Sequence, residues 1–213
     1  MRIVIFAALL ALAACQKEPA PTTPAQVPPP TTASAPERHT GVQGWESDPT
    51  GYARLGSIAP DFKAKRQGGG EVTQDNLRDR WTILAFWGVW SEDSIANVKY
   101  IRALNSAADQ DPDLDFLSVH VPPGPGRGSE AFGASPSLDV WFKENGGAWP
   151  TIIDEDGKIA EAFRIENPPL YLLVGPDLTI EAYRHDLSAT PEDGIKPVMR
   201  GIAEIKKQIA APE

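Results

Sequence analysis

The strongest constraint on the fold of this chain is a near-continuous apolar run, WTILAFWGV, at residues 81–89. Side chains alternate between the two faces of a strand, so a strand that is apolar at almost every position suits a sheet covered on both faces. Apolar residues then recur at helical spacing, at Ile95, Val98, Ile101, Leu104 and Ala108. This part of the sequence therefore predicts a buried strand that leads directly into a helix.

Ser91 is the expected N-cap of that helix. Its hydroxyl can accept a hydrogen bond from a backbone N–H that the first helical turn leaves unpaired. Glu92 and Asp93 follow it, and carboxylates are favourable at the positive end of a helix dipole. The pattern fixes the expected start of the helix at this position.

The remaining pattern alternates between strands and helices. In chain order it predicts a strand at 115–121, a Pro/Gly-rich loop at 122–136, a short helix at 137–144, a hairpin at 170–183 and a final helix from about Pro197. Such alternation is typical of α/β proteins. We therefore predict one α/β domain over residues 45–213, with a mixed central β-sheet flanked by helices.

Residues 1–14 have the features of a secretory signal peptide: a short basic start, a brief apolar run and small residues before Cys15. The apolar run is shorter than the roughly 20 residues that a membrane-spanning helix needs. The sequence Leu-Ala-Ala-Cys at 12–15 resembles the bacterial lipobox, in which the cysteine is acylated and becomes the new N-terminus. We expect lipidation of Cys15; the alternative is an ordinary signal peptide that is cut elsewhere.

Residues 15–44 are expected to form a tether that begins at the lipidated Cys15. The segment is rich in Pro, Ala and Thr and has too few apolar residues to offset the entropy of ordering, so we predict an extended, disordered chain. In lipoproteins of Gram-negative bacteria, Gln rather than Asp after the cysteine accompanies sorting to the outer membrane. The resemblance and Gln16 together imply a lipid anchor at the periplasmic face of the envelope, in the outer membrane.

The charge of the chain excludes one class of partner. The formal net charge is -9 and the pI is about 4.9, so no basic stripe offsets repulsion from phosphate, and we expect no nucleic-acid partner. The three histidines, His39, His120 and His185, do not follow a metal-ligand spacing. We expect neither a metal nor a cofactor.

Four segments, in the same order and spacing, resemble the periplasmic thioredoxin-like oxidoreductases of the TlpA/ResA type. These are GSIAPDF at 56–62, LRDRWTILAFWGVW at 77–90, WPTIID with DGKI at 149–159, and IENPPLYLLV at 165–174. The resemblance implies a thioredoxin-like fold and a periplasmic thiol–disulfide oxidoreductase ancestry. It also places Pro169 at the cis-proline of that family.

The chain departs from this family where the chemistry takes place. Where the family has Trp-Cys-x-x-Cys, this chain has WSEDS at 90–94, so serines Ser91 and Ser94 replace both redox cysteines. Thiol–disulfide exchange requires a thiolate, which a serine cannot supply. A serine nucleophile would need an adjacent base, and only the approach of His120 or His185 in the folded protein leaves that possibility open. We expect Ser91 to cap the helix and predict no catalytic residue.

Aromatic and proline residues next to the altered motif suggest a binding surface. We expect a shallow apolar groove lined by Trp90, Trp149, Pro169 and Leu170, since exposed tryptophan is favoured where proteins bind peptides. The leading hypothesis is a redox-inactive binding or assembly module for an envelope protein or peptide. Two alternatives remain open: an oxidoreductase of the family that uses non-standard residues, and a structural spacer without a ligand.

Overall fold

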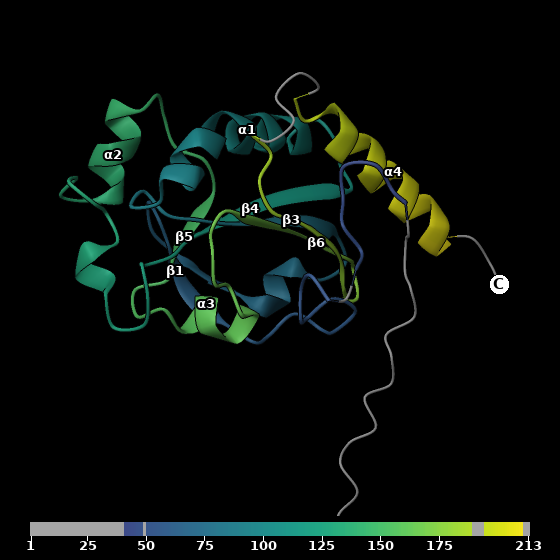
Figure 1. Ribbon diagram of the computed structural model, residues 1–213, viewed down its shortest axis with the longest axis horizontal. Coiled ribbons are helices and arrows are strands. Elements are labelled where there is room, and N and C mark those ends of the chain that lie inside the picture. Colours follow the sequence, from purple (N-terminus) through teal and green to yellow (C-terminus); the bar gives the residue numbers. More distant parts are fainter. Residues whose placement is uncertain (1–40, 49, 189–193, 211–213) are drawn as a thin grey trace, which may run out of the picture. The chain divides into compact units, whose positions relative to one another are not determined.

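The structure is a computed structural model, shown in Figure 1, and it describes residues 41–48, 50–188 and 194–210. The expected signal peptide, Cys15 and Gln16 lie outside the described residues, as does most of the expected tether. Within the described ranges, no helix has the length and apolar character needed to cross a membrane.

The described residues form a seven-stranded mixed sheet with the strand order β2-β1-β5-β4-β3-β6-β7. The strands are β1 (Lys63–Arg66), β2 (Glu71–Thr73), β3 (Trp81–Trp87), β4 (Leu114–His120), β5 (Thr151–Ile153), β6 (Leu170–Val174) and β7 (Ile180–Arg184). β3 and β4 are parallel, as are β4 and β5, and the other neighbours are antiparallel. The predicted α/β class with a mixed central sheet is confirmed.

Helices cover both faces of this sheet, as Figure 1 shows. They are α1 (Glu92–Ala108), α2 (Leu138–Glu144), α3 (Lys158–Phe163) and α4 (Lys196–Ala210), with short 3-10 helices at η1 (Gln74–Leu77) and η2 (Gly128–Glu130). Side chains of α1 and α4 belong to one core cluster, and side chains of α3 belong to a second. We call the two sides of the sheet the α1 face and the α3 face.

β3 supplies both cores, as its sequence predicts. All seven of its residues are buried. Ile83, Ala85 and Trp87 pack on the α1 face, whereas Leu84 and Phe86 pack on the α3 face. β3 lies between β4 and β6 in the sheet, and the chain passes from its end directly to Ser91 and α1.

The outer edge of β7 is covered by an N-terminal segment of the domain. The backbone of Glu46 exchanges two hydrogen bonds with Tyr183, at 2.7 and 3.0 Å. Ile58 forms an isolated bridge with Thr179, and the N–H of Gly56 donates to the carbonyl oxygen of Ile180 at 2.8 Å. At the other edge, β2 has only three residues.

Candidate functional site

Ser91 lies at the N-terminus of α1 and caps it. Its backbone is extended, with φ of -96° and ψ of 120°, and its Oγ accepts a hydrogen bond from the Ser94 N–H at 3.2 Å. Glu92 and Asp93 occupy the first turn, where the helix dipole favours negative charge. The capping role predicted for Ser91 is confirmed.

The same hydroxyl also joins the helix to the segment before β6. The Ser91 Oγ–H donates to the carbonyl oxygen of Pro168 at 3.1 Å. The peptide bond between Pro168 and Pro169 is cis, which is the geometry that the resemblance predicts at this position. Ser91 therefore uses its hydroxyl both as an acceptor within α1 and as a donor to the neighbouring segment.

Ser94 has a comparable role in the interior. Its side chain is fully buried, and its Oγ accepts a hydrogen bond from the N–H of Gly88 at 3.2 Å. Gly88 directly follows β3, so this bond connects the end of the strand to the first turn of α1. Both Ser91 and Ser94 thus satisfy backbone groups that would otherwise lack a partner.

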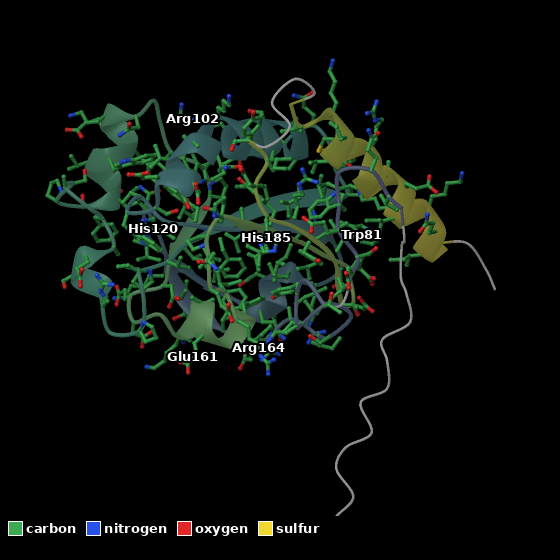
Figure 2. All side chains as sticks on the ribbon, viewed as in Figure 1. Trp81, Arg102, His120, Glu161, Arg164 and His185 are labelled. Carbon is green, nitrogen blue, oxygen red and sulfur yellow. The ribbon has the colours of Figure 1, made fainter. Side chains whose placement is uncertain are left out.

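Neither of the two described histidines pairs with these serines. The Nε2 atom of His120 accepts a hydrogen bond from the N–H of Val89 at 3.3 Å, and the ring of His185 lies against Tyr183. Burial lowers the pKa of His120 to about 4, so the ring is neutral near pH 7. Figure 2 shows His120 and His185 well apart in the domain. The Ser–His arrangement that the sequence left open is not formed.

Trp90 presents its ring to the surface while its polar atom is used internally. The Nε1–H donates to the carbonyl oxygen of Val121 at 2.7 Å, and the half-buried ring packs on the α3-face core. A Cβ atom on Gly88 would lie 2.4 Å from Trp90 Nε1. Gly88 therefore leaves the space that the indole occupies.

Trp149 does not share this surface, and its expected place in the groove is wrong. It is only 4% exposed and belongs to the α1-face core. Its Nε1–H donates to Ser118 Oγ at 3.1 Å, and its ring contacts Trp87 and Phe142 at centroid distances of 5.0 and 4.6 Å. The sheet separates Trp149 from Trp90, because the two side chains pack on opposite faces.

Pro169 and Leu170 also lie deeper than expected. Both are buried, and Leu170 packs in the α3-face core as the first residue of β6. The proline that reaches the surface cavity is instead Pro168. The surface beside Trp90 therefore lacks Pro169 and Leu170, because β6 is an inner strand whose two faces are both covered.

A pocket of about 620 Å³ opens beside Trp90, and we call it the Trp90 pocket. Its wall consists of Trp90, residues 121–125, Gly157, Ala160, Glu161, residues 164–166 and Pro168. Three separate segments therefore meet there: the end of β3, the loop after β4, and α3 with the chain that follows it. Periodicity alone could not find this pocket, although the run Val-Pro-Pro-Gly-Pro at 121–125 was a visible sign of a rigid loop.

The described residues offer no metal centre: across these ranges, no group of three or more His, Cys, Asp or Glu side chains is placed to hold a metal ion. Asp154 is a buried carboxylate, but it accepts hydrogen bonds from the N–H groups of Ile159 and Ala160 at 3.2 and 2.8 Å. Burial raises its pKa. Its contacts give Asp154 a structural role at the start of α3.

Comparison with known proteins supports the fold. The family model described as AhpC/TSA family matches residues 55–187, whereas no curated protein matches the chain significantly. A putative thiol:disulfide interchange protein DsbE from Chlorobium tepidum superposes with a TM-score of 0.52 at 14% identity, over 71% of this chain and 96% of that one.

Two further solved structures give the same result. The exposed lipoprotein thioredoxin Etrx1 from Streptococcus pneumoniae strain TIGR4 has a TM-score of 0.51 at 18% identity, over 70% of this chain and 99% of that chain. A putative thioredoxin from Neisseria meningitidis has a TM-score of 0.53 at 18% identity, over 72% and 93%. The predicted thioredoxin-like fold is confirmed.

Proposed function

The chain belongs to the AhpC/TSA family, and from that membership we propose that it is a redox-inactive thioredoxin-fold protein that binds an envelope protein or peptide beside Trp90. In this proposal it is a binding or assembly module of the TlpA/ResA type. The protein keeps the thioredoxin-like fold but binds a partner instead of carrying out thiol–disulfide exchange.

The observation that carries the proposal is the bonding of Ser91 and Ser94. Thiol–disulfide exchange needs a thiolate and a second thiol that can close and reopen a disulfide. Here the two hydroxyls cap α1 and hold the end of β3. The only cysteine of the chain is Cys15, and an acylated cysteine has no free thiol.

The surroundings of Ser91 also argue against its use as a nucleophile. Its proton is donated to the Pro168 carbonyl oxygen and not to a base, which an activated serine requires. A helix N-terminus contributes about 0.3–1 kcal/mol and at most about 2 kcal/mol. That equals roughly one pKa unit, and Glu92 and Asp93 oppose a further negative charge.

The proposal includes a lipid anchor at Cys15 that holds the domain at the periplasmic face of the outer membrane. Its support is the Leu-Ala-Ala-Cys sequence at 12–15, Gln16, and the Pro-rich segment that follows. More than one acyl chain gives durable membrane attachment, whereas a single chain is marginal. One structural relative is itself described as an exposed lipoprotein.

Family membership favours a second candidate, an oxidoreductase that acts through non-standard residues. Reduction of insulin disulfides distinguishes the two. We expect the native protein to be inactive and the double variant Ser91→Cys/Ser94→Cys to form a disulfide with slow exchange. A cysteine at a helix N-terminus gains thiolate stabilisation, which Glu92 and Asp93 partly cancel. Activity of the native protein would refute the redox-inactive reading, and thiols that never pair would refute the assignment of the two positions.

Binding is tested by photo-crosslinking in intact cells. A photoreactive phenylalanine analogue in place of Pro125, which is exposed at the rim of the Trp90 pocket, should yield a discrete crosslinked partner. The same analogue in place of Glu144, at the end of α2, serves as the control and should yield none. The same crosslinking result at Pro125 and at Glu144 would favour the third reading, a spacer without a ligand.

A further inference from the structure

Apolar and charged side chains both line the Trp90 pocket. Trp90, Pro122, Pro123 and Pro168 supply rigid apolar surface. The indole N–H is already bonded to Val121, so the ring offers its apolar face and edge to a ligand. Proline-rich segments bind to aromatic-lined grooves because their extended conformation is formed before binding.

The charged side chains of the pocket include more carboxylates than guanidinium groups. Glu161, Glu166 and Arg164 line the pocket, and Glu92 and Asp93 are exposed directly after Ser91, whose hydroxyl holds Pro168. Within the described part of the chain, none of these five side chains forms an ion pair. Among the side chains that line the pocket, two carboxylates are therefore present with one guanidinium. Figure 2 shows Glu161 and Arg164 together beside α3.

Two ion pairs lie at residues close in the chain to the pocket lining. Arg127 pairs with Glu130, and Lys158 pairs with Asp156. These pairs contribute little net charge, and the lining of the Trp90 pocket itself has one more carboxylate than guanidinium. Complementary charge across an interface selects partners and speeds their encounter.

We propose that the Trp90 pocket binds an extended segment of a partner protein that carries lysine or arginine next to proline. The prolines pack on Trp90 and Pro168, and the basic side chains pair with Glu161 and Glu166. Arg164 donates to backbone carbonyl groups of the segment, which an extended chain leaves unpaired. The inference rests on the proposed binding function and adds the chemical class of the partner.

Two synthetic nine-residue peptides test this class. Both contain the same three prolines, and one carries three lysines where the other carries three glutamates. Isothermal titration calorimetry with the full protein should show binding of the lysine peptide and at least about 10-fold weaker binding of the glutamate peptide, because like charges oppose it. Raising the salt concentration should weaken the binding of the lysine peptide.

A matched pair of variants locates the effect. Glu161→Gln/Glu166→Gln should bind the lysine peptide about 3- to 10-fold more weakly, as expected for two partly exposed ion pairs. Asp109→Asn/Glu144→Gln changes the net charge equally at exposed carboxylates outside the pocket and should leave affinity unchanged. Thermal unfolding of both variants checks that each is folded.

The outcomes separate this inference from the function on which it rests. An equal loss of affinity in both variants, or equal binding of both peptides, would overturn the basic class of partner. Failure of both peptides to bind would also overturn it, while a crosslinked partner obtained from the Pro125 position would still support a binding function. Loss of that crosslink would overturn the binding function itself.

Discussion

At the residue scale, two hydroxyl groups at the start of α1 each hold a backbone group that the domain would otherwise leave unpaired. Ser91 accepts from the Ser94 N–H, and Ser94 accepts from the Gly88 N–H. Sequence reasoning could predict the cap because capping depends on neighbours in the chain. It could not predict the Ser91–Pro168 bond, which depends on how distant segments fold together.

Removing the cap should weaken the fold. Ser91→Ala is expected to lower the free energy of unfolding by about 1–2 kcal/mol, since it loses both the N-cap bond and the bond to Pro168. Urea denaturation measures the change. Ser106→Ala, at an exposed position of the same helix, is the control and should change stability by less than about 0.5 kcal/mol. Equal effects would mean that the capping bonds contribute nothing.

His120 should make stability depend on pH. Burial lowers its pKa from 6.5 to about 4, so the unfolded chain takes up the proton first as the pH falls. The contribution of neutral His120 to the free energy of unfolding is fully present above about pH 6.5. It is lost as the pH falls towards 4, which lowers that free energy by about 3 kcal/mol.

The test is the dependence of unfolding free energy on pH between 7 and 4. His120→Gln should flatten the curve relative to the native protein, because glutamine does not titrate. His185→Gln, at an exposed position, should keep the native slope. A native slope in the His120 variant would contradict the assignment.

At the element scale, the sequence predicts the long periodic segments, the short helix α2 and the β6–β7 hairpin, but not β2, β5 or α3. β3, α1 and α4 can be predicted because their apolar patterns run over many residues. β2 and β5 have three residues each, and α3 has six. Segments of this length are too short for an apolar period to be recognised. α3 depends instead on the buried carboxylate of Asp154 at its start.

Of the four residues expected to line a groove, only Trp90 lines the pocket. The place of Trp90 and Ser91 between β3 and α1 follows from the apolar pattern of these two elements. Trp149 was misplaced because its position in the chain does not reveal the sheet face on which it packs. Residues 121–125 and Arg164 join the pocket only through the topology of β4 and α3, which local patterns do not encode.

Gly88, which directly follows β3, leaves the space that the Trp90 indole needs at the pocket. Gly88→Ala would place a Cβ 2.4 Å from Trp90 Nε1, so the indole must shift and its bond to Val121 is strained. We expect a loss of about 1–3 kcal/mol in unfolding free energy and weaker binding of the lysine peptide. Gly124→Ala is the control for stability alone, since its nearest neighbour would lie at 3.8 Å but Gly124 itself lines the pocket. Unchanged stability and binding in Gly88→Ala would contradict this role of the glycine.

At the scale of the whole molecule, the prediction concerns attachment. Mass spectrometry of the mature protein should find Cys15 as an acylated N-terminus, and the protein should fractionate with membranes. Cys15→Ser should remove the modification and the membrane association together, because the acyl chains supply the attachment. An unmodified N-terminus beyond Cys15 would contradict the anchor.

The covered edge of β7 limits how copies of this domain can associate through their sheets. An open edge strand is a template on which a second sheet can grow. Here Glu46 and Gly56 already occupy the backbone groups of β7, and β2 offers only three residues at the opposite margin. If the proposed anchor holds copies on one membrane surface, they collide often, but their sheets offer little free backbone on which filaments could grow.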